Sequence, residues 1–374
     1  MKSVLVVSFS DLGRDPRVHR QLMALRKRYE VTSLGYAPSR VEGVAHLEVE
    51  PPRGLALRLR NAALSLLRLD GLYYWTQPQV RAALARLRGR QFDLVLANDL
   101  DALPLCARVA QDRARLIVDA HEYAPREFED RWTWRLLHQR RVRALCRDYL
   151  TRADGLMTVC QGIADAYERD YGVKAQVVTN ATAFQELSPS PVHDGRIRLI
   201  HHGVASPSRH PEEMIRMMRY LDDRFSLDFM LIAHNPAYLH RLQEMARDDP
   251  RIRFLPPVAM PAIAAFINGY DVGLFLLPPV SFNYAHALPN KFFEFVQARL
   301  AIAIGPSPEM LRLVETYDLG VVAEDFTAAG MARALSSLTR DQIEHFKRRA
   351  DAAAAELCAE RNETLLLDLV EGRS

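Results

Sequence analysis

The sequence contains few cysteines, and they form no recognisable motif. Cys106, Cys146, Cys160 and Cys358 lie far apart in the 374-residue chain, and no two of them make a C-x-x-C pair. Structural zinc sites, dithiol redox centres and disulfide frameworks all depend on defined cysteine spacings. The sequence therefore argues against all three classes and predicts reduced, partly buried thiols.

Long apolar runs and a large net charge are also missing. No apolar stretch approaches membrane-spanning length, and the N-terminus leads straight into a short strand-like run at residues 4–7. The formal net charge of +3 is too small to indicate a nucleic-acid partner. With 21 prolines and 17 glycines there is no room for long low-complexity linkers. We therefore expect a cytoplasmic globular protein that binds no nucleic acid.

Short apolar runs alternate with helical patterns along the whole chain, which indicates an α/β fold. A chain of this length exceeds what one hydrophobic core usually serves, so the alternation predicts two doubly wound domains. Buried parallel strands are expected at residues 4–7, 29–34, 92–97, 116–118, 156–159 and 177–180, and then at 197–201, 229–232, 252–255, 272–276 and 301–304.

The boundary between the two domains is expected in residues 186–195, which combine Ser-Pro and Asp-Gly turn signals. This places an N-terminal domain at residues 1–185 and a C-terminal domain at 195–359. Residues 340–369 read as one long alanine-rich helix or a pair of helices. The last part, about residues 360–374, is expected to pack back on the first domain.

Positive charge is concentrated between Arg53 and Arg90. Eight arginines stand there against the single Asp70, and leucines and aromatic residues interleave with them. Such a basic amphipathic segment could lie on an anionic membrane. It could equally be a solvated arginine face around a core helix. Peripheral contact with the inner face of the cell membrane therefore stays one of two interpretations.

The strongest local signal for a binding site is the sequence LPNKFFEF at residues 288–295. Pro289 and Asn290 mark a helix start, where unpaired backbone N–H groups attract an anion. Lys291 adds a positive charge there. Glu294 lies about one turn further on the face of Asn290, where it could bind a sugar diol. This predicts a nucleotide-sugar site, and the alternative is an ordinary capped helix with a surface Lys–Glu pair.

Polar residues that follow the early strands are further candidates. Asp15 and Arg17 follow the first strand and could line a cleft, because loops at the carboxyl ends of strands do so in open α/β sheets. Asp99 and Asp101 could hold a metal-bound diphosphate, but capping of the next helix is favoured.

Two histidine-containing segments also follow predicted strands. His121 and Glu122 come directly after a buried strand, with Glu127 nearby, which favours a position in a cleft. The strand that starts the second half ends at His201 and His202, which are unconvincing metal ligands because adjacent strand residues point to opposite faces. Gly203 then permits close backbone approach, and Arg209 could pair with a phosphate.

Taken together, these residues resemble the GT-B fold glycosyltransferases, and among them the retaining enzymes of group 1 or family 4 type that extend bacterial polysaccharides and glycolipids. The resemblance covers nearly the whole chain. It implies an α/β protein of two Rossmann-like, doubly wound domains that face each other across a cleft. The matching motifs, in order, are DPRV at 15–18, DAHE at 119–122, ADG at 153–155, Asn180, His202-Gly203 with Arg209, and PNKFFE at 289–294 with Gly305 and Glu309.

The resemblance also implies roles for the donor site. Glu294 matches the glutamate that grips the ribose, and His286 falls where the family has the glutamate that faces the sugar. Arg209 fits the diphosphate-binding arginine, and Lys291 is assigned to help it. Leu255 is expected beside the base. The implied donor is a nucleotide-diphosphate sugar, by default linked to uridine diphosphate, with no cofactor.

The implied reaction is sugar transfer with retention and without a metal, in which the leaving diphosphate assists the incoming hydroxyl. His121, Glu122 and Asp15 are the candidates for the catalytic side chains. Arg17 and Asp99 are expected on the acceptor side. The acceptor is expected to be a polysaccharide, a lipid-linked glycan or another glycan.

Two alternatives stay open. A non-hydrolysing nucleotide-sugar epimerase shares the two-domain architecture and would use several acid–base carboxylates, although the order of the motifs fits transfer better. A catalytically inactive, transferase-like binding subunit would be consistent with His286 at the first glutamate position.

Overall fold

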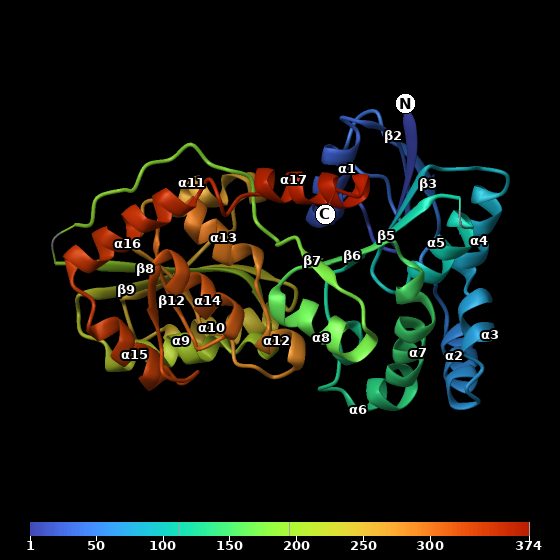
Figure 1. Cartoon of the computed structure of the whole chain (residues 1–374). Helices are drawn as coiled ribbons and strands as arrows, with labels where there is room; N and C mark the ends of the chain where they lie inside the picture. The colour runs from blue at the N-terminus through green and yellow to red at the C-terminus, as the bar shows by residue number, and fades with distance from the viewer. Residues whose placement is uncertain (112, 194, 374) are drawn as a thin grey trace. The chain divides into compact units, whose positions relative to one another are not determined.

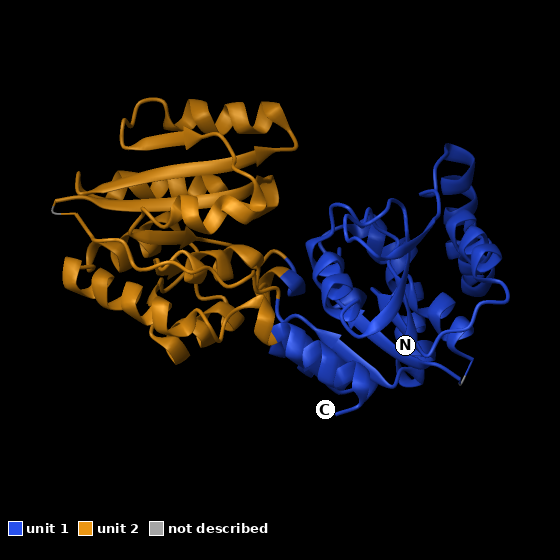
Figure 2. Cartoon of the chain, turned by 90° about the horizontal axis from the view of Figure 1, so that it is seen from above, with its two compact units in different colours: residues 1–179, 281–283, 362–374 blue, residues 180–280, 284–361 orange. Residues whose placement is uncertain are grey.

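Parallel strands alternate with helices through the whole chain and form two separate sheets (Figure 1). The structure is a computed structural model and describes residues 1–111, 113–193 and 195–373. Its contacts divide the chain into two compact units (Figure 2). Unit 1 comprises residues 1–179, 281–283 and 362–374, and unit 2 comprises residues 180–280 and 284–361.

Unit 1 is built on a seven-stranded parallel sheet in the order β3-β2-β1-β4-β5-β6-β7. The strand β1 lies inside this sheet, where Val4 pairs with Val31 of β2 on one side and with Leu94 of β4 on the other. Its buried part, residues 4–7, is fully apolar, as expected for a strand that is covered on both faces. The strands are β1 (Lys2–Val7), β2 (Tyr29–Gly35), β3 (Ala45–Glu48), β4 (Leu94–Asn98), β5 (Arg115–Ala120), β6 (Gly155–Thr158) and β7 (Ala175–Val177).

Helices connect the strands of unit 1, and the final helix of the chain packs against the same unit. Leu366 and Leu369 of this helix belong to the core of unit 1, and Glu363 forms an ion pair with Lys27. The predicted end at residue 374 lies outside the described residues. The helices are α1 (Pro16–Leu25), α2 (Leu55–Leu66), α3 (Asp70–Trp75), α4 (Pro78–Leu87), α5 (Leu103–Ala110), η1 (Ala124–Arg126), α6 (Trp132–Trp134), η2 (Arg135–Gln139), α7 (Arg140–Tyr149), η3 (Leu150–Arg152), α8 (Gln161–Tyr171) and α17 (Ala359–Glu371).

Unit 2 repeats the architecture with a six-stranded parallel sheet in the order β10-β9-β8-β11-β12-β13. The strands are β8 (Ile197–Ala205), β9 (Phe225–Ala233), β10 (Ile252–Leu255), β11 (Val272–Phe275), β12 (Ala301–Ile304) and β13 (Gly320–Val322). The helices are η4 (Pro207–Arg209), α9 (Pro211–Met217), η5 (Met218–Tyr220), α10 (Pro236–Ala246), η6 (Met260–Ala262), α11 (Ile263–Ile267), α13 (Asn290–Gln297), α14 (Pro308–Tyr317), α15 (Ala328–Ser336) and α16 (Arg340–Ala353). The short helix α12 (Phe282–Ala285) begins in the segment 281–283 of unit 1 and ends in unit 2.

The predicted α/β fold is confirmed, and each predicted strand overlaps an observed one. The segment predicted to be one helix or two is a pair, α16 and α17. Two edge strands, β3 and β13, were not predicted, because both are short and at most half-buried, so they lack a continuous apolar run.

The segment at residues 186–195, predicted as a linker, is held against unit 2; its Asp194 lies outside the described residues. The hydroxyl of Ser190 donates to the carbonyl of Asn268, whose amide donates to the carbonyl of Ser188. Val192 lies in the core of unit 2. The division between the units therefore falls earlier than expected, between Thr179 and Asn180.

In the part of the chain that the structure describes, no helix is both long enough and apolar enough to cross a lipid bilayer.

Candidate functional site

The helix α13 of unit 2 begins at the carboxyl edge of its sheet, because it leads back to the start of the parallel strand β12. Its apolar face packs into the sheet: Phe293 and Phe295 are fully buried. Gly273 of β11 makes this possible, since a Cβ there would lie 2.3 Å from the ring of Phe295. No side chain caps the start of α13 at Pro289, so the helix presents its first backbone N–H groups and the positive end of its dipole.

Two cations lie near the backbone of Gly203, just in front of this helix start. A Cβ at Gly203 would lie 3.2 Å from Nζ of Lys291 and 3.8 Å from Nη1 of Arg209, and the glycine has a φ of +120°. Lys291 is only 5% exposed. Burial and the charge of Arg209 lower the pKa of Lys291 well below its usual range. Within the described residues, neither cation forms an ion pair with a carboxylate. Two buried or half-buried cations placed together in this way favour an anionic ligand.

His201 holds the ammonium of Lys291 in place. Its Nδ1 lies 2.9 Å from the carbonyl oxygen of Leu274, which can only accept, so Nδ1 carries the proton. Nε2 is then the acceptor that faces Nζ of Lys291 at 3.5 Å. The ammonium also lies 4.2 Å from the ring centre of Phe275. Burial and Lys291 lower the pKa of His201 well below its usual range, so its ring is neutral.

Glu294 lies beside the second histidine of the same strand. Its Oε2 is 3.5 Å from Nε2 of His202, and both side chains are buried. The ring of His202 packs edge-on against Phe295. Burial and the charge of Lys291 lower the pKa of His202 to about 3, so this ring is also neutral at physiological pH.

The other donor-site candidates lie around α13. Asn290 is its first residue, and Leu255 is the last residue of β10; both are half-buried. His286 follows α12, and its Nδ1 lies 3.4 Å from Oε1 of the buried Glu309 in the first turn of α14. The position that the sequence predicted to face the sugar is thus occupied by His286, and the carboxylate of Glu309 contacts the ring of this histidine.

In unit 1, His121 lies between two carboxylates at the carboxyl edge of the sheet. Its Nδ1 is 3.5 Å from Asp99 and its Nε2 is 3.3 Å from Asp119. The side-chain oxygen of Asn98 also lies 3.3 Å from Nε2. Burial opposes the charged ring, but the two carboxylates outweigh it and raise the pKa of His121 to about 9. His121 is therefore a fixed imidazolium at neutral pH.

Asp119 is the buried centre of a network that ties together distant parts of unit 1. The guanidinium of Arg17 grips it with two hydrogen bonds of 2.6 and 2.7 Å, and Gln21 donates to the same carboxylate. Arg17 also donates to the carbonyl of Val178. Although burial favours the neutral acid, the charges of Arg17 and His121 outweigh it and hold the pKa of Asp119 well below its usual range.

Two site candidates of unit 1 have partners within the unit. Arg17, predicted on the acceptor side, is 7% exposed and bound to Asp119. Asp15, predicted as a catalytic residue, caps α1, because its carboxylate accepts from the backbone N–H groups of Arg17 and Val18. The roles of both residues at the site stay predictions.

The prediction that Asp99 or Asp101 caps α5 is wrong, since the N-cap is Ala102 and no side chain bonds there. Asp99 turns the chain with a φ of 63° and accepts from the backbone N–H of His121 instead.

Glu122 and Glu127 lie close enough to His121 for its charge to lower the pKa of each. Burial and the neighbouring carboxylates raise the pKa of Glu127 to about 8 and raise that of the more exposed Glu122. The amide of Asn283 donates to Glu122, and its oxygen accepts from the backbone N–H of Tyr123 at 2.8 Å. Asn283 belongs to the short segment 281–283 that joins unit 1 from the second half of the chain.

Comparison with known proteins relates these features to a family. Residues 17–186 match the family described as Glycosyltransferase Family 4. Anabaena HepE in complex with UDP-glucose is similar over 100% of both chains, with a TM-score of 0.71 and 13% sequence identity. An α,α-trehalose-phosphate synthase (UDP-forming) from Burkholderia xenovorans, in complex with glucose-6-phosphate, is similar over 99% of this chain and 100% of its own, with a TM-score of 0.68 and 13% identity. No curated protein matches the sequence.

The chain has the GT-B fold, and its first half matches a glycosyltransferase family. At such low identities the solved structures show a shared fold, and the family match lies in the first half of the chain. The predicted GT-B fold with two Rossmann-like domains is thereby confirmed.

Sequence reasoning overlooked four residues that contact the candidate side chains of the two units. Asp119 and His202 lie inside quoted motifs but received no role, because their partners are distant in sequence. Gln21 and Asn283 gave no signal at all, since an isolated amide on a helix has no distinctive pattern.

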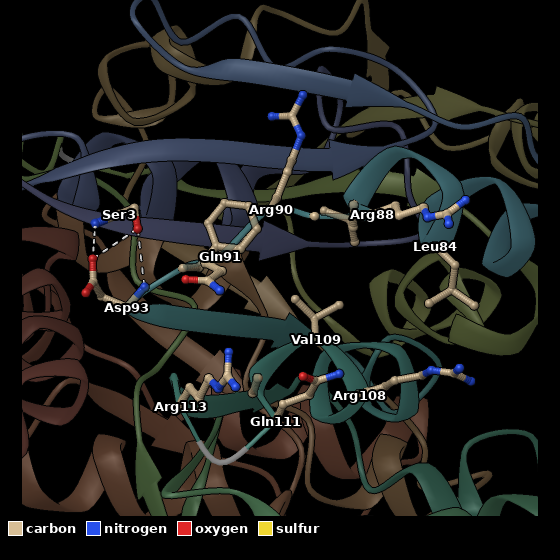
Figure 3. A pocket seen from close by; sticks show the side chains of 14 residues that line it. Ser3, Leu84, Arg88, Arg90, Gln91, Asp93, Arg108, Val109, Gln111 and Arg113 are labelled. Carbon is tan, nitrogen blue, oxygen red and sulfur yellow. Dashed lines mark hydrogen bonds between the residues drawn. The ribbon is translucent and has the colours of Figure 1, made fainter.

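A pocket of about 750 Å³ contains none of the candidate residues around His121 or Lys291 (Figure 3). It lies at the amino edge of the sheet of unit 1, where Ser3 and Asp93 precede or begin their strands. The labelled arginines point in different directions rather than toward one centre, so the pocket does not resemble an anion site. Across the described ranges, no three His, Cys, Asp or Glu side chains are arranged to hold a metal ion.

Proposed function

We propose that this protein is a glycosyltransferase that moves a sugar from a nucleotide-diphosphate donor, by default a uridine diphosphate sugar, and that unit 2 binds the donor. The carrying observation is the pair of cations at Gly203, which have no carboxylate partner among the described residues and stand before the uncapped start of α13. A diphosphate matches this charge, and Glu294, one turn further, suits a ribose diol. Complexes of similar solved structures with UDP-glucose or UDP support the choice of base.

The reaction we propose is transfer with retention and without a metal ion. Lys291, Arg209 and the helix dipole would stabilise the charge that develops on the leaving diphosphate, which is the role a metal has in other transferases. Glu309 would orient the ring of His286 toward the donor sugar. In unit 1, the fixed positive charge of His121 and the raised pKa of Glu127 suit the acceptor hydroxyl and the reacting carbon.

The acceptor we propose is a lipid-linked or polymeric glycan at an anionic membrane. On α2, Leu55, Leu59 and Leu66 share one face and are 72%, 63% and 62% exposed. Arg58 and Arg60 are exposed beside them, and α2 contacts η2, where Leu136 is 63% exposed. Exposed leucines flanked by arginines suit insertion at a charged lipid surface.

A nucleotide-binding panel tests the donor assignment. Calorimetry with uridine, guanosine, adenosine and thymidine diphosphates, with and without magnesium, should show magnesium-independent binding of one of them. Glu294→Ala and Arg209→Ala should each weaken it by about 1–3 kcal/mol, the cost of one charged hydrogen bond. Unchanged affinity in both variants would show that the donor binds elsewhere.

Turnover distinguishes the enzyme from its alternatives. A transferase releases the nucleoside diphosphate only as sugar appears on an acceptor, and NMR of the product reports whether the anomeric configuration is retained. Conversion of the donor sugar into its epimer without an acceptor would identify the epimerase. Tight binding with no turnover of any donor would identify the inactive subunit.

A further inference from the structure

The helix α13 carries a cation and an anion three residues apart, yet they do not pair. Lys291 and Glu294 occupy positions i and i+3, a spacing at which opposite charges on a helix usually attract each other. Both side chains are buried, where this attraction is stronger than at the surface. Even so, within the described residues Lys291 forms no ion pair. Something must hold the two charges apart.

Each of the two charges lies instead beside one histidine of β8. Nε2 of His201 is 3.5 Å from Nζ of Lys291, and Nε2 of His202 is 3.5 Å from Oε2 of Glu294. Adjacent residues of a strand point to opposite faces, so the two rings draw the two charges to different sides of β8. Lys291 reaches its histidine past Gly203, where a side chain would crowd the ammonium.

His202 has a further property that points to function. Its Nε2 is buried and, among the described residues, has no hydrogen-bond partner in good geometry, although Oε2 of Glu294 lies 3.5 Å away. An unsatisfied buried polar atom is costly, so its retention needs a reason. A neutral ring that faces a carboxylate can donate Nε2–H to it without cancelling its charge, whereas the ammonium of Lys291 would cancel it.

We propose that His201 and His202 are positioning residues that keep Lys291 and Glu294 apart, so that the cation meets the diphosphate and the carboxylate meets the ribose of the donor. The inference rests on the proposed donor site. It also explains why two neutral histidines follow each other in β8 beside that site. Without His202, Glu294 would turn toward Lys291, and both ligand contacts would weaken together.

The first test needs no ligand. The side-chain carbon signals of Lys291 in selectively labelled protein report its pKa by NMR, with Arg209, His201 and Glu294 as the neighbouring charged or titratable groups. In His202→Leu the pKa of Lys291 should rise toward the usual lysine range, because Glu294 then pairs with it. In His202→Gln, whose amide nitrogen replaces Nε2, it should stay low. An unchanged pKa in a folded His202→Leu protein would overturn the inference, whatever the donor is.

The second test measures ribose recognition. Wild-type protein and His202→Gln should both prefer uridine diphosphate to its 2′-deoxy and 3′-deoxy forms, and His202→Leu should lose about tenfold of this preference. His202→Asn, whose amide replaces Nδ1 rather than Nε2, is the matched control and should behave like His202→Leu. Equal preference in all four proteins would contradict the positioning role. Failure of the wild-type protein to bind any nucleoside diphosphate would instead contradict the proposed function, while the NMR result would still decide the inference.

Discussion

The two units place histidines near the carboxyl edges of similar sheets but give them opposite charge states. In unit 2, burial and the charge of Lys291 lower the pKa of His202, which lies within β8, to about 3. In unit 1, two carboxylates outweigh burial at His121, which directly follows β5, and raise its pKa to about 9. The balance between burial and the surrounding charges decides whether the ring serves as a neutral hydrogen-bonding group or as a fixed cation.

The same contrast applies to the charges around the histidines. Unit 1 compensates its buried charges internally, since Asp119 is matched by Arg17 and His121. Unit 2 leaves Lys291 without a carboxylate partner among the described residues. A site that is already neutral holds its structure, whereas a site with excess charge favours a ligand of the opposite sign.

The largest effect should follow from breaking the compensation in unit 1. Arg17→Met leaves the carboxylate of Asp119 buried with only His121 to balance it, so we expect a loss of about 3–5 kcal/mol in the free energy of unfolding. Urea denaturation measures it. Arg14→Met removes an arginine from an exposed ion pair with Asp11 and should cost less than about 0.5 kcal/mol. Similar costs for the two variants would mean that the network around Asp119 is not a structural anchor.

The next largest effect should be on binding in unit 2. Lys291→Met removes one of the two uncompensated cations, so the free energy of nucleoside diphosphate binding should weaken by about 2–3 kcal/mol. Calorimetry is the measurement. Lys347→Met is the matched control, because Lys347 is also a buried lysine of unit 2 but donates to Ser190 and to the carbonyl of Tyr270. Loss of affinity in the control alone would contradict the assignment of the site.

The charge state of His121 should appear in the pH dependence of stability. Its pKa in the folded protein, about 9, lies above the ordinary value of 6.5, so its stabilisation is complete below pH 6.5 and is lost as pH rises to 9. His121→Gln should therefore cost about 2–3 kcal/mol at pH 6 and almost nothing above pH 9.

Thermal denaturation of both proteins across this pH range tests that expectation. His345→Gln, which alters an exposed histidine beside Asp318, should cost little at any pH. A penalty for His121→Gln that does not change with pH would show that the ring is neutral and that its carboxylates are compensated otherwise.

The smallest effect concerns charge outside both sites. Replacing Arg58 and Arg60 by serine should weaken the free energy of binding to anionic liposomes, measured by sedimentation, by about 1 kcal/mol for each arginine. Nucleotide affinity should stay unchanged. Replacing Arg333 and Arg348, two exposed arginines of unit 2, is the control and should leave sedimentation unchanged. Equal behaviour of the two double variants would remove the membrane surface from the proposal.

Local sequence predicted the features that depend on neighbouring residues. The apolar runs located β1, β11 and β12, because a strand covered on both faces needs continuous apolar side chains. Pro289 marked the start of α13 for a similarly local reason. Predictions failed where several local interactions compete. Asp99 can cap a helix or turn the chain, and the backbone of His121, 22 positions away, supplies its partner.

The sequence by itself therefore determined two α/β units and the order of their strands along the chain. It also determined that His121 follows a strand, that Lys291 lies in the first turn of a helix, and that Glu294 lies about one turn further. Only the tertiary structure decided how those side chains are charged and paired. The ion pair between Arg17 and Asp119 spans 102 positions, and the contact between His202 and Glu294 joins a strand to a distant helix. Burial and the sign of nearby charges set a pKa, and both are properties of packing that no local pattern of residues contains.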